Sequence, residues 1–346
     1  MRAPERGAQR SPRDGMGTPS HTMITETPIP SIFKSMPAEP PAQGLYPGTG
    51  DAAYRRIRAW NQSILKDLGE WSNDGQAILP APGRSPAHVR AILEGRVSKT
   101  SKAKDFGTDY HMLLLEPERF AREYVALNEK LDLRRTEDKE LYAELVRNYG
   151  ADRVLDAQEW ARLKDMADAA AANPMAKAII GAIGEHELMG VFTEPSTGSV
   201  CKFRVDKAAK NTKGRPVLVD LKSTRCAHPR MFERDAARFG YHVQAALYCD
   251  GYAAITGEMP TYFILAQESA PPYPAVVYRV PEEAIDAGRV VYRAGLALIE
   301  KCVKTNEWPG YADGRVVDLH LPDWAQAERE PVFDTDEGAD DDDDWT

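Results

Sequence analysis

Residues 217–224 read Val-Leu-Val-Asp-Leu-Lys-Ser-Thr, which is the composition of a buried β-strand. Side chains alternate along a strand, so the two valines and Leu221 face one way while Leu218, Asp220 and Lys222 face the other. An acid and a base therefore lie side by side on one face of the predicted strand.

A second apolar run, residues 200–205, ends at Asp206, and the segment 208–216 after it has the Asn, Gly and Pro of a hairpin connection. Antiparallel pairing of the two runs brings Asp206 and Asp220 into one neighbourhood. Two carboxylates beside a lysine suit a hard cation such as Mg²⁺ and a water that attacks phosphate. For this pattern alone, a surface hairpin with an ordinary ion pair is the alternative.

Further polar residues flank this hairpin in the sequence. Tyr241, Gln244 and Tyr248 fall at helical spacing, so that one helix face presents a glutamine between two tyrosines. Upstream, Glu187 opens an apolar stretch, and residues 107–111 (Gly-Thr-Asp-Tyr-His) begin a leucine-rich helix.

Together these residues resemble the PD-(D/E)xK nuclease superfamily in its RecB-like branch, and most closely the RecE (exonuclease VIII) type of prophage exodeoxyribonuclease. The resemblance covers residues 58–310 and is carried by His111, Glu187, Asp206, Asp220-Leu221-Lys222 and Gln244 with Tyr248. It implies an α/β fold: a restriction-endonuclease-like core with a mixed central sheet flanked by helices, and an inserted helical layer.

The resemblance also implies roles for these residues. Five are expected to hold Mg²⁺, with Mn²⁺ as a substitute: His111, Glu187, Asp206, Asp220 and the main-chain carbonyl of Leu221. Lys222 is expected to orient and help deprotonate the attacking water, and Gln244 and Tyr248 to position the DNA backbone or that water. By composition Glu185 would serve as well as Glu187, and only the register of the resemblance favours Glu187.

The charge of the chain is unevenly distributed. Its formal net charge is −9, but residues 334–346 contain eight acids and no Lys or Arg, which leaves −1 on the rest. Residues 202–230 contain nine basic residues against two acids, Asp206 and Asp220. The predicted metal ligands therefore lie in the most basic part of the chain, as expected of a site that receives a polyanion.

Two basic groups are candidates for contact with DNA phosphates. The first lies in residues 84–104, where Glu94 is opposed by several basic residues, and comprises Arg84, Arg90, Arg96, Lys99 and Lys102. A merely solvated surface is the alternative for this group. The second lies around the predicted hairpin and comprises Lys202, Arg204, Lys207 and Arg225.

Composition suggests three regions. Residues 1–50 are rich in Pro, Ser, Thr and Gly and are predicted to be a disordered leader. Residues 51–315 are predicted to form the nuclease domain, with a helical part at 51–182 and the catalytic sheet core at 183–303. Residues 316–346 are predicted to be a solvated acidic tail, with a DNA mimic or partner-docking segment as the alternative.

Several classes of protein are disfavoured. No run of about 18 apolar residues is present, which argues against a transmembrane helix, and the first residues lack the apolar stretch of a signal peptide. The four cysteines lie far apart without a C-x-x-C motif, so neither a zinc site nor an iron–sulfur cluster is indicated. Reduced thiols in the cytoplasm are the expectation.

The predicted function is a metal-dependent exodeoxyribonuclease acting on linear double-stranded DNA through backbone contacts. The resemblance implies 5′-to-3′ digestion from duplex ends, a ring-shaped homo-oligomer and a single-strand annealing protein as partner. Two alternatives stay open: an endonuclease or single-strand nuclease of the same superfamily, and a non-catalytic DNA- or partner-binding protein on a nuclease scaffold.

Overall fold

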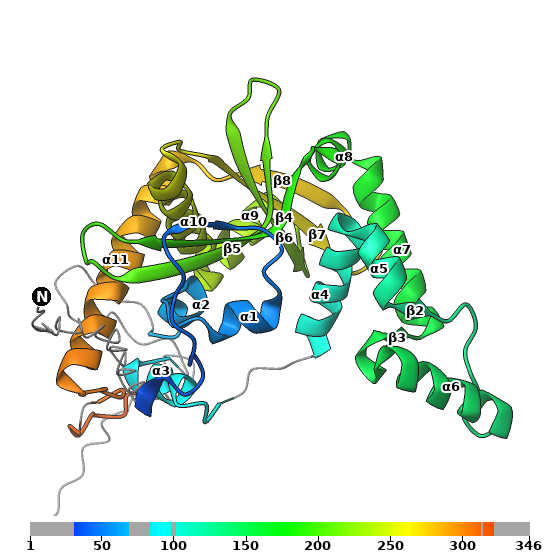
Figure 1. Ribbon diagram of the computed structural model, residues 1–346, viewed down its shortest axis with the longest axis horizontal. Helices are drawn as coiled ribbons and strands as arrows, with labels where there is room; N and C mark the ends of the chain where they lie inside the picture. Colours follow the sequence, from blue (N-terminus) through cyan, green and yellow to red (C-terminus); the bar gives the residue numbers. More distant parts are fainter. Residues whose placement is uncertain (1–30, 69–83, 98–101, 313, 322–346) are drawn as a thin grey trace, which may run out of the picture.

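The computed structural model describes residues 31–68, 84–97, 102–312 and 314–321. Its centre is a mixed six-stranded sheet in which only β6 and β7 run parallel to each other. In spatial order the strands are β1 (Gly44–Tyr46), β4 (Gly184–Thr193), β5 (Val200–Lys210), β6 (Pro216–Thr224), β7 (Thr261–Glu268) and β8 (Ala275–Arg279). A mixed sheet flanked by helices confirms the predicted fold class (Figure 1).

The predicted hairpin is formed by β5 and β6, but its connection is shorter than expected. β5 continues past Asp206 to Lys210, and the turn occupies only 211–215. The Asn211 side chain accepts hydrogen bonds from the main-chain N–H groups of Lys213 and Arg215, at 2.9 and 3.0 Å, which closes the turn.

The main hydrophobic core lies between one face of the sheet and the helices α10 (Tyr241–Thr256) and α11 (Glu282–Thr305). Leu218 of β6 joins this core, as the predicted alternation requires. The short helix α9 (Pro229–Phe239) leads into α10 through Gly240, whose left-handed conformation (φ 69°) allows the sharp change of direction. α10 and α11 pack closely because Gly288 has no side chain: a Cβ there would lie 2.2 Å from the carbonyl oxygen of His242.

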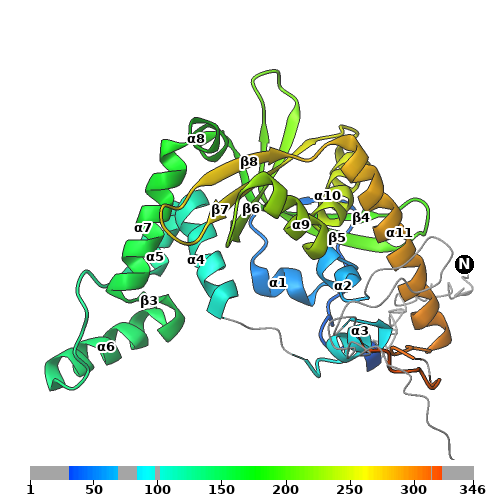
Figure 2. The ribbon, with the colours of Figure 1, turned by 180° about the vertical axis from the view of Figure 1, so that it is seen from behind.

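The other face of the sheet is covered by α4 (Lys102–Leu115) and α8 (Pro174–Gly181). The two valines of β6 and Leu221 pack here, on the face opposite Asp220. α5 (Pro117–Glu123), α6 (Thr136–Tyr149) and α7 (Ala157–Ala172) form the inserted helical layer, with a short parallel pair of strands, β2 (Val125–Ala126) and β3 (Val154–Leu155). Both views place this layer at the end of the molecule away from α11 (Figures 1 and 2).

The N-terminal part of the fold begins earlier than predicted. It contains the 3₁₀ turn η1 (Ser31–Phe33), then β1, α1 (Asp51–Arg56) and α2 (Gln62–Lys66), and α3 (Pro86–Leu93) follows. β1 pairs with β4 at the edge of the sheet, so the boundary predicted at residue 50 is wrong for residues 44–46. Residues 1–30, and residues 322–346 of the predicted tail, lie outside the described residues.

In the part of the chain that the structure describes, no helix combines the length and the hydropathy needed to cross a membrane.

Candidate metal centre

Three potential metal ligands from three separate elements meet at one place. They are His111 on α4, Glu187 on β4 and Asp206 on β5, and one ligand atom from each lies within 4.8 Å of the others. His111 Nδ1 is 3.6 Å from Asp206 Oδ2. All three line a cavity of about 530 Å³ between α1, α4 and the sheet, where the ribbons of α1 and α4 lie next to each other (Figures 1 and 2).

The hairpin brings Asp206 to the strand that carries Asp220. Asp206 Oδ2 accepts a hydrogen bond of 2.7 Å from the main-chain N–H of Leu221. Asp220 itself is buried, with only 3% of its surface exposed, and its Oδ1 accepts a hydrogen bond of 2.5 Å from Gln244 Nε2. The predicted proximity of the two aspartates is thus seen in the structure, and the contact of Gln244 with Asp220 is an additional finding.

Asp220 and Lys222 form an ion pair through Asp220 Oδ2 and the ammonium nitrogen. Burial raises the pKa of Asp220, and Lys222 opposes that rise. Burial would lower the pKa of Lys222, but the carboxylates of Asp220 and Asp206 outweigh it and raise that pKa. Lys222 is therefore an ammonium group, and the Tyr241 ring lies 5.1 Å from its nitrogen.

Glu187 occupies an unusual backbone position. Its φ is 49°, in the left-handed region that non-glycine residues rarely adopt, at a point where β4 and β5 pair on either side of it. Burial, together with the charge of Asp206, raises the pKa of Glu187 to about 7. Glu185, the compositional alternative, is exposed and outside the cluster. Strained backbone of this kind is concentrated at functional sites.

Tyr248 is buried in the hydrophobic core. It is 8% exposed, and its ring packs against Phe203 and Tyr262, with centroids 5.5 and 6.3 Å apart. Gln244, one turn earlier on α10, is the residue of this helix that contacts Asp220 directly.

Two of the predicted DNA contacts are wrong because the side chains are buried. The Lys202 side-chain nitrogen donates to the carbonyl oxygens of Tyr54 and Ile57, and that of Lys207 donates to the carbonyl oxygen of Ile180. Both lysines are about 1% exposed or less. They support the fold from beneath and offer no charge to a ligand at the surface.

The remaining basic candidates are dispersed. Arg204 lines the cavity, whereas Arg225 is exposed beyond the end of β6. Arg90 and Arg96 both pair with Glu94 on α3, which packs against the segment after α11. Arg84 is half-buried at the start of α3. Lys99 and the side chain of Lys102 lie outside the described part of the chain.

The cavity also contains residues that the sequence did not single out. They come from α1, which begins directly after the predicted leader, and from the inserted layer and its approach, and include Asp51, Arg55, Glu116, Arg119, Tyr124 and Arg153. Arg119 and Arg153 both pair with Glu123. No local motif marks these positions, because each reaches the cavity only through long-range packing.

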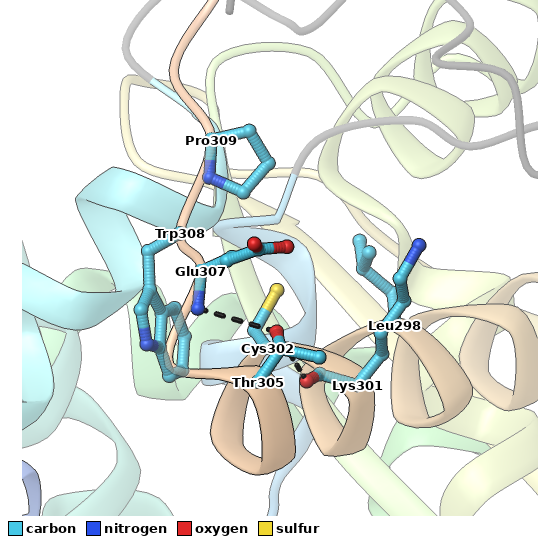
Figure 3. A pocket seen from close by; sticks show the side chains of 7 residues that line it. All are labelled: Leu298, Lys301, Cys302, Thr305, Glu307, Trp308 and Pro309. Carbon is cyan, nitrogen blue, oxygen red and sulfur yellow. Dashed lines mark hydrogen bonds between the residues drawn. The ribbon is translucent and has the colours of Figure 1, made fainter.

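A second cavity, of about 510 Å³, lies at the C-terminal end of α11 (Figure 3). Its lining includes Cys302, Glu307 and Trp308, and Glu307 N–H donates to Thr305 Oγ1 at 3.2 Å. Among the described residues, His111, Glu187 and Asp206 are the group of three clustered side chains that could hold a metal ion. No such group of three described residues lines the second cavity. The chemistry is therefore concentrated between α1, α4 and the sheet.

The donor set of the first cavity fits a divalent cation. Carboxylate oxygens and one imidazole suit Mg²⁺ or Mn²⁺. Asp220 Oδ2 is buried and, apart from its ion pair, accepts no hydrogen bond of regular geometry from the described residues. A buried carboxylate oxygen with no regular hydrogen bond is a suitable oxygen ligand for a cation.

A mixed sheet with Asp220-x-Lys222 on one strand and Asp206 on its neighbour is the arrangement of a PD-(D/E)xK-type nuclease, a class that generally uses divalent metal ions. Residues 62–315 match the model of the PDDEXK-like domain of unknown function (DUF3799). The chain therefore belongs to that family.

Two solved structures are similar to the chain. A candidate exonuclease from Eubacterium rectale has a TM-score of 0.49 and 14% identity, over 76% of this chain and 91% of that one. An alkaline exonuclease from Laribacter hongkongensis has a TM-score of 0.25 and 17% identity, over 55% of this chain and 95% of that one. We infer nothing about activity from either likeness. Among curated proteins, none matches the chain.

Proposed function

We propose that the chain is a Mg²⁺-dependent exodeoxyribonuclease that digests linear double-stranded DNA from its ends. The observation that carries the proposal is the Asp220–Lys222 ion pair on β6, the strand next to β5, whose Asp206 lines one cavity together with His111 and Glu187. Carboxylates that hold a cation next to a fixed ammonium group suit hydrolysis of a phosphodiester.

The metal would be held by His111, Glu187, Asp206, Asp220 and the carbonyl of Leu221. When bound, it would supply positive charge to the phosphate and to the leaving oxygen. Gln244 holds Asp220 Oδ1, which leaves Oδ2 for Lys222 and the cation. Lys222, kept as an ammonium group by its neighbours, would orient the attacking water by donating hydrogen bonds.

The substrate would be recognised through its backbone. Arg204, Arg55, Arg119 and Arg153 line the cavity beside the predicted ligands, and arginine suits phosphate because of its fork of N–H donors. Such contacts carry no base sequence and weaken as salt rises. Arg225, Arg84, Arg90 and Arg96 lie outside the cavity and would contribute only to a longer DNA path.

The finer properties come from the resemblance of the sequence to RecE-type enzymes. We extend the proposal to 5′-to-3′ digestion, a ring-shaped homo-oligomer, a single-strand annealing protein as partner, and a role in DNA recombination or repair in the cytoplasm. Tyr248, one helical turn after Gln244 on α10, would support the position of that side chain.

The proposal is tested by incubating the full chain with linear duplex DNA and with a covalently closed circle, with Mg²⁺ and with EDTA. Loss of the linear DNA only in Mg²⁺, with an intact circle, is the expected result. Cutting of the circle would instead indicate an endonuclease. Binding of DNA without cleavage in Mg²⁺ or Mn²⁺ would indicate a binding protein on a nuclease scaffold.

A further inference from the structure

A segment that precedes the family match is built into the edge of the central sheet. The match begins at residue 62, whereas residues 44–60 include β1, α1 and Trp60. β1 pairs with β4, and Trp60 exchanges main-chain hydrogen bonds with β5: its N–H donates to Val200, and its carbonyl oxygen accepts from Lys202 at 2.8 Å.

A buried lysine fixes α1 of this segment over β5. The Lys202 side-chain nitrogen donates to the carbonyl oxygens of Tyr54 and Ile57 at 2.9 and 2.7 Å, at the C-terminal end of α1. The nitrogen also lies 4.8 Å from the centre of the Tyr54 ring. α1 is thus held in one position beside the cavity.

Arg204, two residues further along β5, is held on both edges and on one face. Its Nη2 lies 2.9 Å from Asp51 Oδ1, and its Nε lies 2.8 Å from Glu187 Oε2. The Tyr54 ring lies 5.1 Å from the centre of the guanidinium group. Two of these three contacts, to Asp51 and Tyr54, come from α1.

We propose that α1 completes the active site, with Asp51 as a positioning residue that holds Arg204 to bind a backbone phosphate of the DNA. The inference rests on the proposed function of the same cavity. A guanidinium group fixed only by Glu187 would stay on a carboxylate that the cation requires. The second anchor at Asp51 keeps Arg204 in the cavity, next to Asp206, when Glu187 is engaged elsewhere.

For the removal of Asp51, the proposal predicts a change in DNA affinity opposite in sign to the change that simple electrostatics predicts. Asp51 is an acid in a cavity that would receive a polyanion, so a merely electrostatic role predicts that its removal tightens DNA binding. If Asp51 instead positions Arg204, its removal weakens binding, because the phosphate contact loses its fixed geometry.

The test is a double-mutant cycle on Asp51→Ala, Arg204→Ala and the double variant, with Asp51→Glu as the conservative variant. Glu39→Ala is the matched control, because Glu39 forms an exposed ion pair with Arg58 in the same N-terminal region and does not line the cavity. DNA affinity is measured by fluorescence anisotropy in Ca²⁺, a hard cation that takes the same oxygen ligands as Mg²⁺. The cleavage rate is measured in Mg²⁺, and folding by thermal unfolding.

We expect Asp51→Ala to weaken DNA binding by about 5-fold and to lower kcat by about 10-fold, with Asp51→Glu recovering part of both. In the Arg204→Ala background the Asp51 substitution should have a much smaller effect, because its ion pair with Arg204 is already gone and only its pair with Arg55 is left. The control should match the wild-type chain.

Three results would overturn the inference: DNA binding by a folded Asp51→Ala chain that equals or exceeds that of the wild-type chain, additive losses in the double variant, or, where Asp51→Ala does not fold, a folded Asp51→Glu chain that binds DNA at least as tightly as the wild-type chain. A wild-type chain that binds DNA but never cleaves it would instead refute the proposed function. In that case the affinities in Ca²⁺ still decide whether Asp51 positions Arg204.

Discussion

The substitution Lys202→Met should change the pH dependence of stability. Lys202 is 0% exposed, and burial lowers its pKa from 10.5 to about 7. A neutral amine has two N–H donors, which match the two carbonyl acceptors of Tyr54 and Ile57. The neutral side chain therefore satisfies this buried site without a buried charge.

The sign of the effect follows from proton linkage. Below pH 7 both the folded and the unfolded chain bind the proton, so the cost of the buried charge is fully present. Between pH 7 and 10.5 only the unfolded chain keeps it, so stability rises with pH by up to about 1.4 kcal/mol per unit. The carbonyl contacts and the Tyr54 ring favour the charged form and make this slope an upper bound.

The assay is urea unfolding of the wild-type chain and Lys202→Met at pH 7, 8 and 9, with Lys34→Met as a surface control. Methionine does not titrate. As the pH rises, the unfolding free energy of the wild-type chain should therefore increase relative to that of Lys202→Met by about 1 kcal/mol per pH unit. Lys34 is exposed, and its variant should show the wild-type slope. Parallel pH profiles for Lys202→Met and the wild-type chain would refute the reasoning.

Three further predictions concern the site and the core. Asp206→Asn should weaken Mn²⁺ binding by about 10-fold or more in calorimetric titration, since it removes a charged ligand of the cluster, and unchanged affinity would remove Asp206 from the ligand set. Gln244→Leu should leave the buried Asp220 Oδ1 without its donor and cost about 1–3 kcal/mol in urea unfolding, and a neutral effect would mean that the observed hydrogen bond is dispensable. Gly288→Ala should cost about 1–3 kcal/mol in thermal unfolding because its Cβ would meet the carbonyl oxygen of His242, and wild-type stability would show that α11 can shift away from α10.

Local patterns in the sequence predict the centre of this fold well. The alternation in residues 217–224 depends only on strand geometry, and the structure sorts Leu218 and Leu221 into different cores as expected. The proximity of Asp206 and Asp220 followed from a single hairpin. His111 and Glu187 are different, because they come from distant elements and only the resemblance to a known family brought them together.

Burial by distant segments is what the sequence does not reveal. Lys202 lies on the same side of β5 as Arg204 and Asp206, yet α1 covers it. That helix begins directly after residues predicted to be a disordered leader, so nothing suggested a cover. Lys207 is likewise covered by the end of α8 through the carbonyl oxygen of Ile180. Counting basic residues cannot separate such lysines from those at the surface.

The most direct test of the proposed active site is the cleavage rate of end-labelled linear duplex DNA by the wild-type chain and by Lys222→Ala. Lys210→Ala serves as the control, because Lys210 is exposed at the far end of β5. We predict Mg²⁺-dependent loss of the 5′ label by the wild-type chain and the control, and a rate about 10³-fold lower for a Lys222→Ala chain that still folds and binds Mn²⁺. Wild-type cleavage by Lys222→Ala, or linear DNA that survives the wild-type chain in both Mg²⁺ and Mn²⁺, would contradict the proposal.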